Sequence, residues 1–253
     1  MAVDQAAVTV TAMTHRGAVR EGNEDALVVG SLTASSVSMS APMRVSLSPN
    51  VPAVVAVADG LGGHAAGEVA ASHTVQRFAE QGEWQEGKET ISELLRAIDA
   101  ELQEYAEDNP DHSGLGTTIA GLLFAGEEIF WFNVGDSRAY RLHPDKLQQL
   151  SQDDSPAVPG AEPGTLAAVT NLITQSLGGS AGELEPHVGT DSPEESASWL
   201  LCSDGLSDLV EGTDMVRLIS EAPDDSSAVT ALWKAAMDAG GRDNISIALV
   251  RMG

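Results

Sequence analysis

Residues 127–145 read EEIFWFNVGDSRAYRLHPD, in which two apolar runs are separated by the short turn GDS. Each run is short, rich in aromatic and aliphatic side chains, and bounded by polar residues, which is typical of a β-strand. The stretch therefore predicts consecutive strands over 128–134 and 138–143 with no helix between them. Parallel neighbours need a crossover of a dozen or more residues, so this stretch favours an antiparallel arrangement.

Similar short runs recur on both sides of this stretch. They predict further strands at 7–13, 26–30, 53–58, 117–125, 184–189, 198–203 and 244–251. Apolar residues at helical spacing predict helices at 66–80, 89–107, 213–221 and 225–239. Asp224 or Asp225 is suited to cap the last helix, and Gly240 and Gly241 to end it. Because strands and helices do not alternate, we expect antiparallel sheets covered by helices, not a parallel doubly wound sheet.

Two segments show no clear periodicity. Residues 31–52 are serine-rich and nearly uncharged, and residues 151–170 contain three prolines. We expect both segments to be loops. The chain has no internal repeat, and 253 residues with 42% hydrophobic content suffice for one large domain over 1–253.

The composition limits the partners of the chain. Its formal net charge is −25, from 13 Lys and Arg against 38 Asp and Glu. Nucleic acid and anionic lipid would be repelled, whereas divalent cations and basic peptide segments would be attracted. Solubility alone explains the charge equally well. No signal peptide or membrane-spanning run of ~18 apolar residues is evident, which predicts a cytoplasmic protein. The single cysteine, Cys202, is expected to be buried and inert.

Acidic residues mark the turn of the opening stretch and four other turns beside apolar runs. These residues are Asp59, Asp136, Asp204, Asp243 and the pair Glu24 and Asp25. Any one of them is explained as an ordinary turn residue. If the strand ends gather at one edge of a sheet pair, however, the carboxylates meet there, and their repulsion raises their pKa values unless cations neutralise them. An oxygen-only cluster favours Mg²⁺ or Mn²⁺ over Zn²⁺.

The stretch 57–68, VADGLGGHAAGE, also fits the pattern G-x-G-x-x-A of dinucleotide-binding turns. That fingerprint needs a second strand ending in an acid about 20 residues on. Glu80 and Glu83 stand at that distance, but they lie where a helix is expected to end. Asp59 would also repel the pyrophosphate, and the Gly-Lys-Ser/Thr of a P-loop is absent. These observations argue against a nucleotide loop.

Six stretches, in this order, resemble the metal-dependent protein phosphatases of the 2C type (the PPM family), bacterial branch. They are THRGAVREGNEDA, VVAVADGLGGHAAGEVAA, GLGTTIAGLLF, FWFNVGDSRAYRL, WLLCSDGLSDLV and GGRDNISIALV, and they span residues 14 to 250. Each is weak alone, but six in sequence are specific. The resemblance implies an α+β fold, a four-layer αββα sandwich of two antiparallel sheets flanked by helices, with a two-metal site at one edge.

The resemblance also implies roles for residues of the first two motifs. Asp59 would bridge two metal ions, and the carbonyl of Gly60 would bind the second of them, with Glu24 beside it. Asp25 would hold a metal-bound water. Arg20 stands where the family has its phosphate-binding arginine; without the motif, an ion pair with Glu21 or Glu24 is the simpler explanation.

In the later motifs, Asp204 and Asp243 would bind the first ion. Asp136, together with Asp204, matches a third, weaker ion of bacterial members. Eukaryotic members have their general acid where Leu61 stands, whereas bacterial members have a histidine where His64 stands. His64 is therefore the candidate acid, with orientation of carboxylates or proton donation by a metal-bound water as alternatives.

One segment departs from the family pattern. Relatives usually have Asp-His-Ser followed by a helical flap, whereas this chain has Asp153-Asp154-Ser155 and then a short Pro- and Gly-rich stretch. The departure predicts a shortened flap over 151–170, in the region that contacts substrate and borders the third ion.

The implied function is hydrolysis of phosphoserine and phosphothreonine in proteins by direct attack of a metal-bridging hydroxide. Two Mn²⁺ or Mg²⁺ ions about 3.5–4 Å apart suit this reaction, which needs no nucleophilic Ser or Cys. The expected protein is a monomer that opposes a bacterial Ser/Thr kinase. Two alternatives are a phosphatase of a phosphorylated anti-anti-sigma-type regulator and a metal-binding pseudophosphatase that serves as a binding module.

Overall fold

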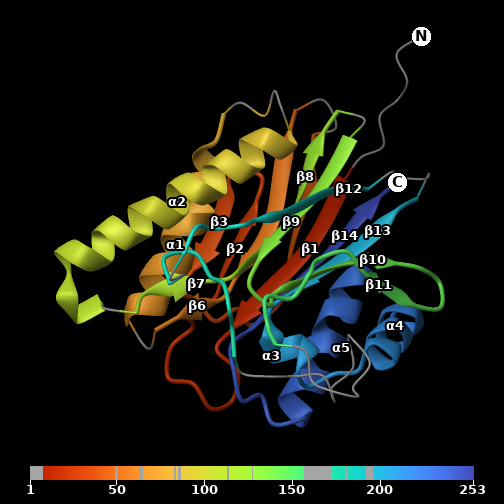
Figure 1. The fold of residues 1–253 in the computed structure, drawn as a ribbon. Helices are drawn as coiled ribbons and strands as arrows, with labels where there is room; N and C mark the ends of the chain where they lie inside the picture. Colours follow the sequence, from red (N-terminus) through yellow and green to blue (C-terminus); the bar gives the residue numbers. More distant parts are fainter. Residues whose placement is uncertain are drawn as a thin grey trace.

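The computed structural model describes residues 8–48, 51–62, 65–82, 84, 87–112, 114–126, 128–156, 172–179, 182–191 and 196–253. These residues form four layers, helices–sheet–sheet–helices (Figure 1). The α+β sandwich expected from the sequence is therefore confirmed.

Both large sheets are six-stranded and antiparallel throughout. The first has the order β11 (Leu147–Gln149), β10 (Arg138–Leu142), β13 (Ser198–Cys202), β14 (Ile245–Met252), β1 (Val8–His15) and β4 (Met43–Leu47). The second has the order β12 (His187–Asp191), β9 (Glu128–Val134), β8 (Ile119–Ala125), β5 (Ala53–Ala58), β2 (Ala26–Val29) and β3 (Leu32–Ser35). A small third sheet pairs β6 (Gly60–Leu61) with β7 (Gly116–Thr117).

The helices cover the outer face of each sheet (Figure 1). The second sheet carries α1 (Ala65–Glu80) and α2 (Lys88–Asp108), and the first carries α3 (Asp204–Ser207), α4 (Gly212–Glu221) and α5 (Asp225–Asp238). A 3-10 turn, η1 (Pro110–His112), follows α2. As predicted, Asp224 caps α5 by accepting a hydrogen bond from Ser227 N at 2.8 Å, and Gly240 follows the helix at φ 118°.

Each central strand is buried on both faces, which explains its continuous apolar sequence. In β5, Val54, Ala56 and Ala58 pack toward α1 and α2. The alternate residues Val55 and Val57 pack between the two sheets. The strands therefore separate three apolar cores, one between the sheets and one under each helical layer.

The opening stretch passes from one sheet to the other. Its two predicted strands are present as β9 and β10, but β9 lies in the second sheet and β10 in the first. The turn that contains Asp136 therefore lies at the edge where the two sheets meet. The candidate functional site lies at this edge.

The prediction of a loop over residues 31–52 was wrong. The segment contributes β3 to one sheet and β4 to the other, each as an edge strand. In β4, Met43, Val45 and Leu47 alternate with more exposed residues and pack on the core between the sheets. The high serine content concealed this period-two pattern.

The second segment without periodicity behaves differently. Residues 151–156 have no regular secondary structure, as expected, and most of the predicted short flap lies outside the described residues. The short edge strand β11 just before it was not predicted. Cys202 is fully buried, and burial raises the pKa of its thiol to about 12. None of the helices in the described part of the chain could cross a membrane.

Candidate metal and phosphate site

Turns from both sheets bring carboxylates together at one edge of the sandwich, and Asp136, Asp204 and Asp243 among them line a pocket there. Asp59 follows β5, Asp136 follows β9, and Asp204 begins α3 directly after β13. Asp243 precedes β14, and Asp25 precedes β2. The strand ends that the sequence marked with acidic residues thus come together at one edge of the sandwich.

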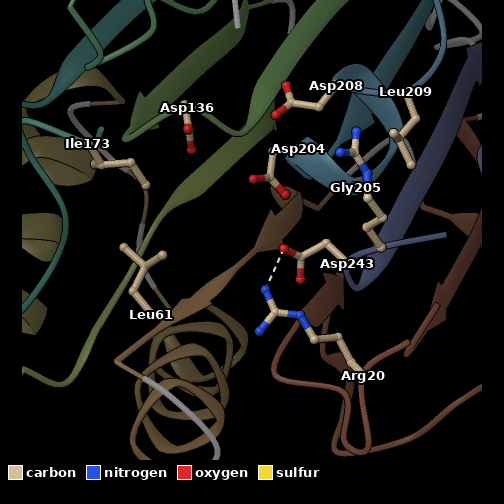
Figure 2. A pocket seen from close by; sticks show the side chains of 10 residues that line it. Arg20, Leu61, Asp136, Ile173, Asp204, Gly205, Asp208, Leu209 and Asp243 are labelled. Carbon is tan, nitrogen blue, oxygen red and sulfur yellow. Dashed lines mark hydrogen bonds and ion pairs between the residues drawn. The ribbon is translucent and has the colours of Figure 1, made fainter. Parts of the chain in front are cut away.

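The pocket itself has a volume of about 540 Å³. It is lined by Arg20, Leu61, Asp136, Ile173, Asp204, Gly205, Asp208, Leu209, Arg242 and Asp243. Figure 2 shows the carboxylates of Asp136, Asp204 and Asp243 around the cavity, with the Arg20 guanidinium reaching Asp243. Four aspartates and two arginines line one cavity, so the site suits a phosphate group only if cations offset the carboxylate charge.

The carboxyls behave as one electrostatic cluster. Burial raises the pKa of Asp25 to about 7, and the charges of Asp204 and Asp243 add to the increase. Burial, followed by the charges of Asp25 and Asp204, raises the pKa of Asp59 well above its usual value. Burial is also the main cause of the raised pKa of Asp204. These carboxyl groups resist being ionised at the same time, and a bound cation would offset the repulsion between their charges.

Two buried carboxylate oxygens in this cluster have no hydrogen-bond partner. Ser203 Oγ donates to Asp25 Oδ2 at 2.8 Å, but Asp25 Oδ1 is left unpartnered, and so is Asp204 Oδ1. Buried oxygens without a donor are costly, so each is a position where a cation or a water would be stabilised.

Glycines bring the backbone next to the Glu24 side chain. A Cβ at position 67 would lie 2.5 Å from Glu24 Oε2, and a Cβ at position 60 would lie 2.7 Å from the Glu24 carbonyl oxygen. Only glycine allows this approach. The motif after Asp59 therefore places Gly60 and Glu24 side by side.

Arg20 forms an ion pair with Asp243, and the charge of Glu24 also stabilises its guanidinium. Its Nη2 donates to Asp243 Oδ2 at 2.6 Å, and about half of the Arg20 side chain is exposed. Asp243 Oδ1 accepts from Asn244 N at 2.9 Å. The guanidinium thus reaches the pocket as predicted, and it is held there by one of the proposed metal ligands.

Asn244 fixes this arrangement, and sequence reasoning missed it. Its Oδ1 accepts from Glu24 N at 2.7 Å, and its Nδ2 donates to the carbonyls of Arg16 and Gly22, both at 3.0 Å. One buried amide therefore ties the loop that carries Arg20 and Glu24 to the start of β14. The only sequence signal was its position directly after Asp243.

Asp136 occupies the turn between the sheets. Burial raises its pKa to about 7, with further contributions from the charges of Asp204 and Asp208. Thr118 Oγ1 and Ser137 Oγ are hydrogen-bonded at 2.7 Å, and Thr118 N donates to the Asp59 carbonyl at 2.9 Å. A short chain of contacts thus connects the Asp136 turn to Asp59.

The sequence matches the profile of one known protein family over most of its length. The sequence profile described as Protein phosphatase 2C matches residues 43–245. The chain belongs to the protein phosphatase 2C family. The resemblance inferred from the six motifs is confirmed.

Relatives agree with the assignment. The chain is 30% identical over 246 residues to the serine/threonine protein phosphatase PstP of Mycobacterium tuberculosis, covering 93% of this chain and 43% of PstP. It is 31% identical over 211 residues to the serine/threonine phosphatase stp of Listeria welshimeri, covering 78% of this chain and 83% of stp. The chain thus spans less than half of the length of PstP.

Solved structures match nearly the whole chain. The catalytic domain of PstP in complex with two manganese ions superposes with a TM-score of 0.75 at 28% identity, covering 97% of this chain and 99% of that structure. The serine/threonine phosphatase of S. agalactiae shares the fold, with a TM-score of 0.76 at 24% identity and coverage of 96% and 98%. The 2C family is metal-dependent, and the PstP structure provides an example with manganese.

The donor set of this 2C-family chain fits a hard divalent cation. Among the described residues, the charged side chains that line the pocket are aspartates and arginines, and two buried carboxylate oxygens of the cluster, Asp25 Oδ1 and Asp204 Oδ1, have no hydrogen-bond partner. Within the described part of the chain, however, no group of three or more Asp, Glu, His or Cys side chains is arranged to hold a metal ion as the side chains stand. Arg20 Nη2 holds one oxygen of Asp243, and the Asp59 and Asp204 carboxyls lie close enough to influence each other's pKa. Binding would have to displace the contact between Arg20 and Asp243.

Two further pocket residues were not predicted. Asp208 and Arg242 line the cavity, and burial together with the charge of Asp204 raises the pKa of Asp208 to about 7. Both stand within predicted motifs, at SDGLSD and GGRDN, but nothing in their spacing distinguished them from surface residues. The predicted acid His64 lies outside the described residues.

Proposed function

We propose that this chain is a metal-dependent protein phosphatase that hydrolyses phosphoserine and phosphothreonine monoesters. The observation that carries the proposal is the convergence of acidic turns from both sheets on a pocket that also contains the Arg20 guanidinium. Family membership gives the reaction class, and relatives named serine/threonine phosphatases give the substrate class.

We assign the metal ligands as follows. Asp59 would contribute to the binding of both of two Mn²⁺ or Mg²⁺ ions, with Asp204 and Asp243 at the first and Gly60 and Glu24 at the second. Asp25 would orient a water, and Asp136 with Asp204 would hold a third, weaker ion. The unpartnered oxygens of Asp25 and Asp204 and the mutually raised carboxyl pKa values support this assignment.

The ions would supply an activated water and neutralise negative charge on the phosphoryl group. The chain supplies positioning. Arg20 offers two N–H groups in a fork to phosphate oxygens, and a half-exposed arginine can exchange its partner Asp243 for an incoming phosphate. Cys202 is buried in a strand and takes no part as a nucleophile.

Proton donation to the leaving seryl or threonyl oxygen is assigned to His64. A histidine titrates near neutral pH, which suits a general acid. Orientation of the carboxylates by His64, with a water as the proton donor, is the alternative, and substitution of His64 by Gln separates the two. Loss of the alkaline limb of the pH profile of kcat, where a general acid would lose its proton, supports the general acid.

The partners follow from the proposed reaction. Substrates are phosphorylated proteins, with a Ser/Thr kinase as the opposing enzyme and the cytoplasm as the location. The excess of 25 negative charges disfavours nucleic acid and membrane surfaces. Residues 1–253 are proposed to act as one domain and as a monomer.

Phosphate release from matched peptides tests this proposal. With Mn²⁺ present, phosphoserine and phosphothreonine peptides should be hydrolysed, and a phosphotyrosine peptide of the same sequence much more slowly. A protein that binds Mn²⁺ but hydrolyses none of the peptides would instead be a binding module. Turnover restricted to a phosphorylated anti-anti-sigma-type regulator would favour that narrower substrate.

A further inference from the structure

Asp154 is a buried carboxylate outside the proposed set of ligands. The family pattern described in the sequence analysis has a histidine at this position. The Asp154 side chain is 11% exposed. Its two oxygens accept from three groups that belong to three different segments of the chain. A buried charge with this many donors is ordered, so its position constrains all three segments.

The first segment is the turn that carries Asp136. Asp154 N donates to the Gly135 carbonyl at 3.0 Å, and Gly135 N donates back to Asp154 Oδ2 at 2.8 Å. Gly135 has φ 93°, and a Cβ there would lie 2.6 Å from Thr118 Cβ. The turn has little room to relax, so Asp154 fixes the backbone that immediately precedes Asp136.

The other two segments are residues 172–179 and the strand β12. Thr174 N donates to the Asp154 carbonyl at 2.8 Å, and Gln175 Nε2 donates to Asp154 Oδ2 at 3.1 Å. His187 Nε2, on β12, lies 2.8 Å from Asp154 Oδ1. Ile173, next to Thr174, lines the pocket, so Asp154 also fixes a second wall of the site.

We propose that Asp154 is a positioning residue that holds Asp136 in place to bind the third, weaker metal ion. Asp154 does not line the pocket and acts through the Gly135 backbone. The inference rests on the proposed function of the same site. It assigns a specific task to a residue that departs from the family pattern.

Mn²⁺ titration calorimetry tests the proposal, because it reads ion binding without catalysis. The variants are Asp154→Ala, Asp154→Asn, Asp136→Ala and the double variant Asp136→Ala/Asp154→Ala. Asp191→Ala is the matched control: Asp191 is 18% exposed and accepts from Arg141 and Trp199, but it lies at the other end of β12. Thermal melting of each protein verifies folding.

We expect Asp154→Ala to weaken the weakest Mn²⁺ site about tenfold and to leave the tight sites unchanged. Asp136→Ala should do the same, and the double variant should be no weaker than Asp136→Ala alone, because both changes act on one ion. Asp154→Asn keeps an acceptor for Gly135 N and should lose less. Asp191→Ala should bind Mn²⁺ like the parent protein.

Three outcomes would overturn the proposal. The first is that Asp154→Ala and Asp154→Asn both bind Mn²⁺ as the parent protein does. The second is that the losses of Mn²⁺ affinity in Asp154→Ala and Asp136→Ala add in the double variant. The third is that Asp136→Ala leaves the Mn²⁺ titration unchanged, which would mean that Asp136 binds no ion. If Asp154→Ala does not fold, Asp154→Asn carries the comparison. Failure of the proposed function appears separately, as a parent protein that binds Mn²⁺ without phosphate release.

Discussion

At the scale of single residues, Arg20 has two competing partners. In the structure it pairs with Asp243 at 2.6 Å, and in the proposed reaction it binds the substrate phosphate. Its half-exposed position suits such an exchange, because a partly solvated ion pair is held only weakly.

Substitution of Arg20 by Ala is therefore expected to raise KM for p-nitrophenyl phosphate more than it lowers kcat, since ground-state phosphate binding is lost. Arg20→Lys should recover little, because an ammonium cannot form the same fork. Steady-state kinetics with Mn²⁺ give the answer. An unchanged KM in Arg20→Ala would leave Arg20 with only its ion pair.

Gly60 offers a second test at this scale. A Cβ at this position would overlap the backbone of Gly67 and lie 2.7 Å from the Glu24 carbonyl oxygen. Gly60→Ala should therefore destabilise the protein by about 1–3 kcal/mol, as overpacked positions do. Gly212→Ala is the control, because a Cβ there meets nothing within 4 Å. Equal denaturant midpoints for the two variants would show that the turn tolerates a side chain.

At the scale of elements, burial decided which strands the sequence could predict. Strands such as β5 and β14 are covered on both faces, so their apolar runs are continuous and were located within one or two residues. The edge strands β3, β4 and β11 are short and partly exposed, so their residues show no strong apolar pattern. The sequence also did not show which strands pair with one another. The strands 128–134 and 138–143 were predicted, but their placement in different sheets was not, because a local pattern does not specify the neighbouring strand.

The site was predictable to the extent that chemistry is local. Acidic residues beside apolar runs identified Asp59, Asp136, Asp204 and Asp243, and the pocket contains three of these side chains. The partner of Arg20 was not predictable, because Asp243 is 223 residues away in sequence. Asn244 was missed for the same reason, since its partners Glu24, Arg16 and Gly22 are 220, 228 and 222 residues away in sequence.

The link between Asn244 and the Arg20 loop yields a prediction about this element. Asn244→Ala removes the acceptor for Glu24 N and the donor to Arg16 and Gly22. Buried polar groups left unpaired cost about 1–3 kcal/mol each. The variant should therefore melt at a lower temperature and show a raised KM, because the loop that carries Arg20 loses its attachment. Asn109→Ala, at an exposed hydrogen bond after α2, is the comparison and should do neither.

At the scale of the whole molecule, the acidic cluster opposes folding when no cation is bound. The pKa of Asp25 is about 7 in the folded protein against an ordinary 3.8, so the folded state holds more protons between these values. Stability of the metal-free protein should therefore fall as pH rises from about 4 to 7. Mn²⁺ should restore it most strongly at the upper end of this range.

Thermal melts at pH 5 and pH 8, with EDTA or with Mn²⁺, measure this dependence. Asp25→Asn is the control, since a neutral amide should flatten the pH dependence of the metal-free protein. Melting temperatures that are independent of pH in EDTA, or an Mn²⁺ effect that is equal at both pH values, would contradict the account of the cluster.

Asp59 and its neighbouring carboxylates are proposed to hold the ions that drive phosphate ester hydrolysis. The most direct measurement compares Mn²⁺-dependent hydrolysis of p-nitrophenyl phosphate by the parent protein, Asp59→Asn and the distant surface variant Asp238→Asn. We expect Asp238→Asn to hydrolyse p-nitrophenyl phosphate at the parent rate. We expect the rate of Asp59→Asn to fall roughly 1000-fold, because metal stabilisation of the transition state is worth several kcal/mol. Equal rates for the parent and Asp59→Asn would contradict this proposal.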